Sequence, residues 1–252
     1  MAATVGSITK WCALALAGLI LTYAVAWTGY RSMKLSKLRP VELPDMASWR
    51  GSETASCRAL FVGDSRVAHW PLPSPSGWTV GKLGYPGQTT ANILRAGLKE
   101  VNRTRPHAVI LLLGGNDAVA ASFMRGERRD AQVRASLKVF DSFVGEVRRR
   151  GTRAIMIMTI VPSIKPPWWK RLLLGSAPTE LSHTINLGLK ALAARRGALM
   201  LHPADVLLTE RGTLRPGYRR DDAHWTPAAY RALDRQVLEA LSSARIGCQL
   251  PR

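Results

Sequence analysis

The chain has 252 residues, of which 46% are hydrophobic, and it carries a formal net charge of +19 at pH 7. This composition excludes a wholly disordered chain, and the length fits one domain of about 200 residues with an appended segment. The positive charge favours anionic partners such as nucleic acid, acidic lipid or acidic polysaccharide. Because no basic run is interleaved with aromatic residues for base stacking, we expect no nucleic-acid partner and interpret the arginines as a solvated surface.

An uncharged run of twenty residues, 11–30, lies near the N-terminus. Its length spans a bilayer core as a helix, and Trp11, Trp27 and Tyr30 lie near its ends, where interfacial aromatic residues are found. We expect a membrane anchor, with a signal peptide cleaved near Ala26 as the alternative. More positive charge follows the run than precedes it, which argues for a cytoplasmic domain. Since long domains are often translocated regardless of such charges, we favour a periplasmic or otherwise extracytoplasmic domain and leave the orientation open.

From residue 57 onward, short apolar runs alternate with segments of helical spacing, which predicts a parallel sheet covered by helices on both faces. The expected strands are 59–62, 78–83, 108–113, 154–161 and 198–201, and the expected helices are 89–102, 131–150, 179–196 and 226–243. The expected organisation is an N-terminal tail at 1–10, the apolar segment at 11–30, a juxtamembrane linker at 31–56 and an α/β domain at 57–252.

The first apolar strand ends abruptly in Gly63-Asp64-Ser65. In an open α/β sheet, reactive groups lie at the carboxyl ends of the strands, so Ser65 is a candidate nucleophile. A serine in this position is more often the N-cap of a helix. The catalytic interpretation therefore depends on whether other strand ends supply a base, a group that orients it and donors for an oxyanion.

Three later turns carry such groups. Gly87, in Gly84-Tyr-Pro-Gly-Gln-Thr-Thr90, allows the backbone to turn sharply and present its N–H. Asn116, after the most hydrophobic strand, can donate hydrogen bonds to an oxyanion, although a turn asparagine often bonds its own backbone instead. Asp221 precedes His224 by three residues, a spacing that can fix Nδ1–H and leave Nε2 free as a base. Asp222 is the less suitable orienter, and we expect it to be solvated.

Together these turns resemble blocks I, II, III and V of the SGNH (GDSL-like) hydrolase superfamily. Their order and spacing match over roughly residues 58–245, and the Gly-x-Ser-x-Gly elbow of α/β-hydrolases is absent because residue 67 is Val. The resemblance implies a flavodoxin-like α/β/α sandwich with a central parallel sheet.

The resemblance also implies a two-step acyl transfer. Ser65 attacks an ester carbonyl, His224 takes its proton, and Asp221 orients His224. The backbone N–H groups of Ser65 and Gly87 and the amide of Asn116 bind the oxyanion. Neither a metal nor an organic cofactor is required.

The substrate is less determined. Arg66 stands where the extended motif usually has Leu, so we expect a cation near the mouth of the site that bears on substrate choice. Trp168 and Trp169 follow a core strand and could stack on a sugar or enter a membrane surface. An anchored, basic, Trp-bearing enzyme suits an envelope polysaccharide with O-acetyl groups. The alternatives are an O-acyltransferase acting on a glycan, a lipid esterase or thioesterase, and a non-catalytic protein that binds anionic polymers.

The three cysteines, Cys12, Cys57 and Cys248, include no Cys-x-x-Cys pair, so no zinc site is indicated. Cys57 precedes the first core strand and Cys248 lies in the C-terminal tail. In an exported domain these two could form a disulfide, and two free thiols are the alternative.

Overall fold

The computed structural model describes residues 2–51, 57–73, 75–163, 166–244 and 246. Within them one sheet has the strand order β1-β3-β2-β4-β5-β6. The five parallel strands are β2 (Cys57–Gly63), β3 (Trp78–Gly84), β4 (Ala108–Leu112), β5 (Ala154–Met158) and β6 (Leu199–Leu201). Without the short antiparallel edge strand β1 (Ser48–Arg50), this is the 2-1-3-4-5 order of flavodoxin-like domains, so the expected fold is confirmed.

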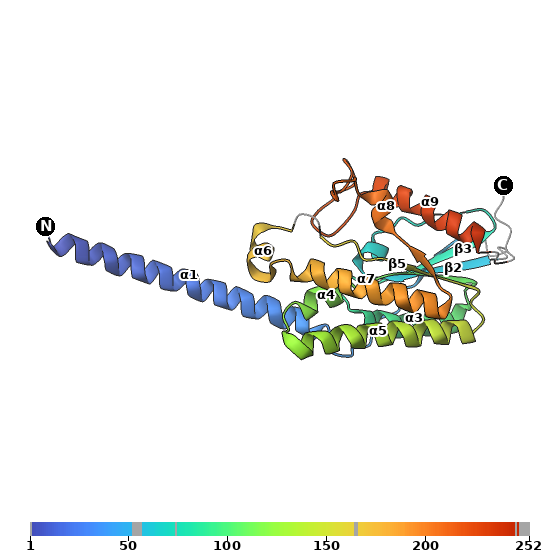
Figure 1. Cartoon of the computed structure of the whole chain (residues 1–252), viewed down its shortest axis with the longest axis horizontal. Coiled ribbons are helices and arrows are strands. Elements are labelled where there is room, and N and C mark those ends of the chain that lie inside the picture. Colours follow the sequence, from blue (N-terminus) through green and yellow to red (C-terminus); the bar gives the residue numbers. More distant parts are fainter. Residues whose placement is uncertain (1, 52–56, 74, 164–165, 245, 247–252) are drawn as a thin grey trace.

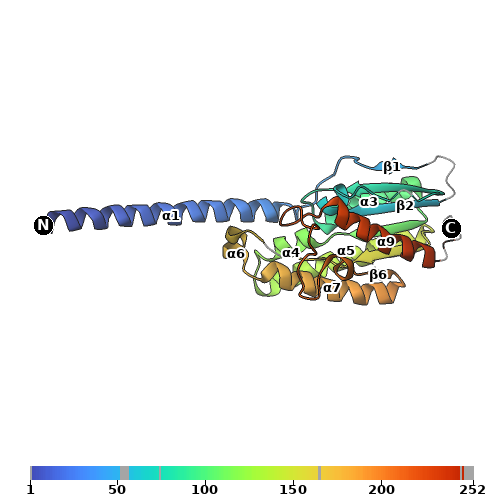
Figure 2. The same cartoon turned by 90° about the horizontal axis from the view of Figure 1, so that it is seen from above.

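Helices cover both faces of the sheet (Figures 1 and 2). One face packs against α3 (Thr90–Thr104), α4 (Gly115–Ala121), α5 (Gly126–Arg149) and α7 (Ala177–Arg196). The other packs against α2 (Ser65–Ala68), α8 (Pro203–Leu207) and α9 (Pro227–Ser243). Because side chains alternate along a strand, Leu60 and Val62 of β2 enter the first core, while Ala59 and Phe61 enter the second. Burial on both faces explains the continuous apolar runs that predicted these strands.

All of the expected strands and helices are present, with shifted ends. The helix expected at 131–150 begins at Gly126, and the strand expected to reach residue 161 ends at Met158. The elements that had not been expected are short: α2, α4, α8, α6 (Trp168–Leu174) and β1. A helix of one or two turns is too short for a helical hydrophobic period to emerge from the sequence.

The helix α1 (Ala2–Ser36) projects from the domain as a long rod (Figures 1 and 2). Its segment Lys10–Ser36 is long and apolar enough to cross a membrane. Its C-terminal part rests on the domain through aromatic rings. Phe123 lies 5.1 Å from Trp27 and 5.6 Å from Tyr30, measured between ring centroids. The end of α1 is therefore held at the carboxyl edge of the sheet, beside α4.

Residues 37–50, within the segment expected to be a linker, lie along the domain. The carbonyl of Lys37 accepts a hydrogen bond from Thr89 Oγ1 at 2.8 Å. Tyr85 donates its hydroxyl to the carbonyl of Pro44 at 2.6 Å. Trp49 Nε1 donates to Glu100 Oε1 at 2.7 Å, and β1 then pairs with β3. This part of the chain fixes the exit of α1 relative to the sheet, and the division at residue 56 stays a prediction.

Cys57 is buried at the start of β2. Cys248 lies outside the described residues, so its pairing with Cys57 stays a prediction.

Candidate active site

Ser65 is the first residue of α2, directly after the carboxyl end of β2. The N-cap of this helix is Asp64, whose carboxylate accepts a hydrogen bond from Arg66 N at 2.9 Å. Ser65 is therefore not the N-cap of α2, which is the role that a serine after a strand more often has. Close packing of backbone fixes the turn: a Cβ on Gly63 would lie 2.2 Å from Leu112 O, and one on Gly84 would lie 2.3 Å from Ala68 N. Only glycine fits at these two strand ends.

His224 and Asp221 complete a hydrogen-bonded series with Ser65. His224 Nε2 lies 2.9 Å from Ser65 Oγ, and His224 Nδ1 lies 2.8 Å from Asp221 Oδ2. We assign the ring proton to Nδ1, because this tautomer donates to the carboxylate and leaves Nε2 to accept from the serine hydroxyl. The structure therefore brings together the three residues that were predicted from the sequence as the nucleophile, the base and the carboxylate that orients the base.

The carboxylate of Asp221 is held in its charged form. Partial burial raises its pKa, but hydrogen bonds from the backbone N–H of Ala223, the ring of His224 and the backbone N–H of His224 lower it to about 2. The two backbone bonds to Oδ1 are each 2.8 Å long. An ionised carboxylate against Nδ1 favours a protonated imidazole ring during a proton transfer.

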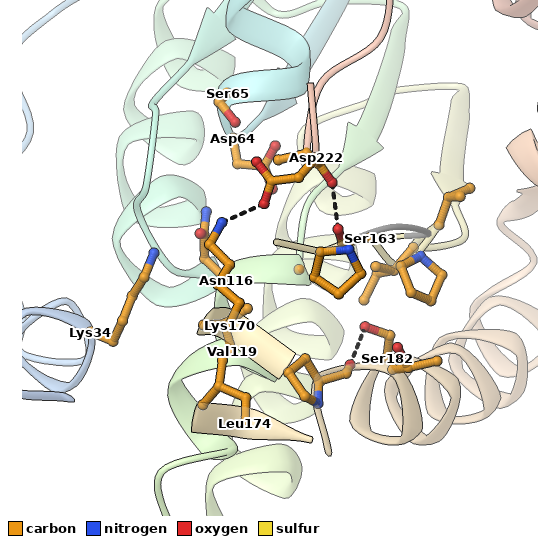
Figure 3. Close-up of a pocket in the computed structure, with 18 of the residues that line it drawn as sticks. Lys34, Asp64, Ser65, Asn116, Val119, Ser163, Lys170, Leu174, Ser182 and Asp222 are labelled. Carbon is orange, nitrogen blue, oxygen red and sulfur yellow. Dashed lines mark hydrogen bonds and ion pairs between the residues drawn. The ribbon is translucent and has the colours of Figure 1, made fainter. Parts of the chain in front are cut away.

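Asp222 is not simply a solvated carboxylate, so that expectation is wrong. Its carboxylate forms an ion pair with the ammonium group of Lys170 on α6, and its carbonyl accepts a hydrogen bond from Ser163 Oγ (Figure 3). Its side chain is 25% exposed. Sequence could not reveal this role, because it depends on where α6 lies in space. The ion pair holds α6 against the loop that carries His224.

Asn116 lies in the first turn of α4, at the carboxyl end of β4. Its amide donates one hydrogen bond, from Nδ2 to Gln88 O, at 3.0 Å. The amide group has two N–H donors, so a second donor remains for a ligand. This bond also fixes the neighbouring turn, where Gly87 has a φ of +72°, in the left-handed region that favours glycine.

A buried carboxylate next to Asn116 locks this part of the site, a role that was not predicted from the sequence. Asp117 accepts hydrogen bonds from Thr90 N at 2.9 Å, Thr90 Oγ1 at 2.9 Å and Ser136 Oγ at 2.7 Å. Burial raises its pKa, and the bonds from Thr90 and Ser136 oppose that shift. Asp117 thus ties α4 to both α3 and α5.

An open cavity of about 920 Å³ lies over Ser65. Its lining includes Ser65, Arg66, Asn116, Lys170 and Leu174 of the domain, together with Tyr30 and Lys34 of α1 (Figure 3). Gly87, Trp168 and Trp169 are not among the lining residues in the described part of the chain. Trp168 is 70% exposed, and Trp169 packs edge-on against Tyr30 at 5.6 Å. No signal in the sequence indicated that α1 would reach this cavity.

Arg66 lines the cavity as expected, but its guanidinium group is engaged by the protein. Its Cζ lies 4.6 Å from the ring centroid of Trp225, and its Nε donates to Ala223 O at 3.1 Å. His69, which no pattern in the sequence singled out, packs edge-on against the ring of His224 with centroids 4.8 Å apart. In the described residues, no group of three or more His, Cys, Asp or Glu side chains is placed to hold a metal ion.

Several solved structures share this fold. A GDSL-like lipase from Bacteroides thetaiotaomicron is 16% identical with a TM-score of 0.60, covering 86% of this chain and 99% of its own. A carbohydrate acetylesterase from Sinorhizobium meliloti is 16% identical with a TM-score of 0.58, covering 75% of this chain and 99% of its own. A catalytic mutant of an acetylxylan esterase from Geobacillus stearothermophilus is 17% identical with a TM-score of 0.55. The match covers 79% of this chain and 97% of the esterase.

A search of curated proteins finds no match. The model of the GDSL-like Lipase/Acylhydrolase family matches residues 61–232, which include Ser65, Asn116, Asp221 and His224. This match spans more than half of the chain. The chain therefore belongs to the GDSL-like lipase/acylhydrolase family and is an ester-hydrolysing enzyme of that family.

Proposed function

We propose that the chain hydrolyses a carboxylic ester through an acyl-enzyme formed on Ser65. The observation that carries this proposal is the 2.9 Å contact between His224 Nε2 and Ser65 Oγ, at a serine that opens into a cavity. A serine hydroxyl is a weak nucleophile until an adjacent base removes its proton, and this contact places a base within reach.

In the first step, Ser65 Oγ bonds to the ester carbonyl carbon while its proton passes to His224 Nε2. The negative oxygen of the tetrahedral intermediate accepts hydrogen bonds from the backbone N–H groups of Ser65 and Gly87 and from the amide of Asn116. The intermediate then expels the alcohol, which takes the proton from His224 and leaves an acyl group on Ser65. In the second step, water gives a proton to His224 and attacks the acyl-enzyme, and the acid departs as the proton returns to Ser65.

We propose a short acyl ester, such as an O-acetyl group on an envelope polysaccharide, as the substrate. Two proteins of the same fold are a carbohydrate acetylesterase and an acetylxylan esterase, which favours this class for a chain with the same arrangement of strands. We further propose that α1 anchors the enzyme in a membrane with the domain outside the cytoplasm. Cleavage near Ala26 with release of the domain is the alternative.

Labelling with a fluorophosphonate tests the proposal, since this reagent requires the nucleophile, the base and the oxyanion donors together. We expect labelling at Ser65, located by peptide mass mapping, and loss of both labelling and ester hydrolysis in Ser65→Ala and His224→Ala. The matched control is Ser182→Ala, which removes another serine of the same cavity. Undiminished labelling or turnover in Ser65→Ala would overturn the proposal.

The finer substrate assignment has its own test. Acetylated oligosaccharide is incubated with the enzyme, and the release of acetate is compared with the transfer of acetyl groups to a second sugar. Acetate release supports a hydrolase, and dominant transfer indicates an acyltransferase. A series of model esters with increasing acyl length completes the test, because preference for long acyl groups would replace the glycan proposal with a lipid esterase or thioesterase.

A further inference from the structure

The helix α1 supplies part of the wall of the cavity over Ser65. Tyr30 and Lys34 both line it, and they lie one helical turn apart on the same face of α1. The ring of Tyr30 is held edge-on by Phe123 and by Trp169, each with centroids 5.6 Å away. These contacts fix the last turns of α1 beside the site. Figure 3 shows the side chain of Lys34 reaching from α1 toward Asn116.

Among the described residues, the other cations that line the cavity have partners within the protein. The ammonium group of Lys170 pairs with Asp222. The guanidinium group of Arg66 stacks on Trp225 and donates to Ala223 O. Both groups are therefore already committed to holding the loop around His224.

Lys34 is the exception, because it has no carboxylate partner. Its Nζ lies over the ring of Tyr30, 5.6 Å from the ring centroid, and within the described residues no carboxylate forms an ion pair with it. The remaining carboxylate of the lining, Asp64, is buried as the N-cap of α2. Asp222 attracts the ammonium group only from beyond ion-pair distance and is itself paired with Lys170. A partly buried ammonium group with no carboxylate in contact is unfavourable, so an anion that enters the cavity gains a charge-assisted contact.

The position of Lys34 differs from that of an ordinary lysine flanking a membrane helix. Such residues extend their charged groups to the lipid head groups. Arg31, one turn earlier on α1, is exposed and does not line the cavity, whereas Lys34 shares the cavity with Ser65 and Asn116. The two residues thus provide a natural comparison between a flanking charge and a charge that faces the site.

We propose that Lys34 binds an anionic group, a carboxylate or a phosphate, on the alcohol side of the ester that Ser65 attacks. This inference rests on the proposed function, since a short acyl group such as acetyl carries no charge and the anion must then belong to the alcohol. It makes α1 a part of the substrate site and assigns substrate specificity to a residue of that helix.

Two matched fluorophosphonate probes test this subsite on the full chain in neutral detergent micelles. One probe ends in a carboxylate and the other in the isosteric carboxamide. In the wild type we expect the carboxylate probe to label Ser65 about tenfold faster, equivalent to about 1.4 kcal/mol. In Lys34→Gln the ratio falls to about one while the carboxamide rate is unchanged, which also shows that the site is intact.

Two further variants sharpen the result. Lys34→Arg keeps the charge and retains most of the preference, and Arg31→Gln behaves as the wild type. Equal rates of the two probes in the wild type, or an undiminished ratio in Lys34→Gln, would overturn the subsite. Absence of labelling by both probes would instead overturn the proposed chemistry at Ser65, so the two failures are distinguishable.

Competition then identifies where the anion comes from. Glucuronate represents the acid group of a polysaccharide, and phosphatidic acid mixed into the neutral detergent micelles represents a lipid phosphate. Either competitor supports the subsite if it slows labelling by the carboxamide probe in the wild type and not in Lys34→Gln. The competitor that has this effect shows whether the anion is a polysaccharide acid or a lipid phosphate. Protection by neither anion counts against the proposal.

Discussion

The guanidinium group of Arg66 lies over the indole ring of Trp225, with Cζ 4.6 Å from the ring centroid. Arg66 directly follows Ser65, and Trp225 directly follows His224. The same guanidinium group donates from Nε to Ala223 O, on the other side of His224. This pair therefore joins the two backbone segments that carry the contacting serine and histidine, which are 159 residues apart in the chain.

We predict that Arg66→Leu lowers kcat for a neutral ester about tenfold and leaves KM nearly unchanged, because the His224 loop loses its attachment and positioning errors are costly in catalysis. Trp225→Leu should have a similar effect, and the double variant should fall no further than the worse single one. Steady-state kinetics measure this, with Arg231→Leu on the outer surface of α9 as control. A change confined to KM would instead indicate that Arg66 contacts substrate, as the sequence suggested.

Removal of the Asn116 amide should lower kcat by about 10²–10³, the usual cost of one oxyanion donor. Asn116→Ala also breaks the hydrogen bond to Gln88 O. The control must therefore separate the effect of a disturbed loop from the loss of an oxyanion donor. Gln88→Ala retains that carbonyl, and we expect its turnover to stay within about threefold of the wild type. Equal losses in the two variants would contradict a direct role for the amide.

Asp221 makes a pH-dependent contribution to stability whose sign follows from its lowered pKa. The pKa falls from 3.8 to about 2 on folding, so the folded state favours the carboxylate. This contribution is present above about pH 4 and is lost as the pH falls through about 2. We expect the difference in Tm between the wild type and Asp221→Asn to shrink over that acid range. Because 45% of the side chain is exposed, the effect should be small. A difference that stays constant through the acid range would contradict the assignment.

Asp221→Asn should also reduce kcat at neutral pH by about 10³–10⁴. The new amide does not fix the His224 ring in the tautomer that carries its proton on Nδ1, as the carboxylate does. The matched control is Asp222→Asn, which removes the neighbouring carboxylate and its pairing with Lys170. We expect a much smaller loss from Asp222→Asn, since that group does not contact the imidazole ring. Comparable losses in the two variants would mean that the loop as a whole, and not the orientation of His224, controls turnover.

Substitution of Gly84 tests the packing that fixes Ser65. In Gly84→Ala the new Cβ would lie 2.3 Å from Ala68 N and 2.5 Å from Ala68 Cα, which forces α2 away from β3. We expect a loss of about 1–3 kcal/mol in the free energy of unfolding, and slower labelling of Ser65. Gly151→Ala is the control for glycine replacement, since its Cβ would meet nothing within 4 Å and only its φ of +90° is unfavourable. Thermal melting would contradict the expectation if Gly84→Ala were the more stable of the two.

The fold and the three residues in the hydrogen-bonded series could be predicted because their signals are local. A continuous apolar run stopped by glycine indicates a buried strand and its carboxyl end, which placed Ser65 and Asn116 at one sheet edge. The spacing of Asp221 and His224 indicates an oriented base without knowledge of the rest of the chain. Parallel strand order then brings these separate turns together.

The residues that could not be predicted depend on contacts between distant elements. Lys34 and Tyr30 belong to a segment whose composition indicates only a membrane helix, and no local pattern says that its last turns pack beside Asn116. The partner of Asp222 is set by the position of α6. Asp117 follows Gly-Gly-Asn in the sequence, which is typical of a turn. Its burial depends on contacts with α3 and α5 that the sequence does not show.

The edge strand β1 has a consequence for how this protein is handled. Its pairing covers β3, and a Cβ on Gly81 would lie 2.5 Å from the indole ring of Trp49, which shows how closely β1 is seated. A shortened chain that starts at residue 57 would leave the outer backbone donors and acceptors of β3 unpaired. Open edges recruit strands from other molecules. Such a chain is expected to aggregate, whereas one that starts at residue 37 keeps the edge closed.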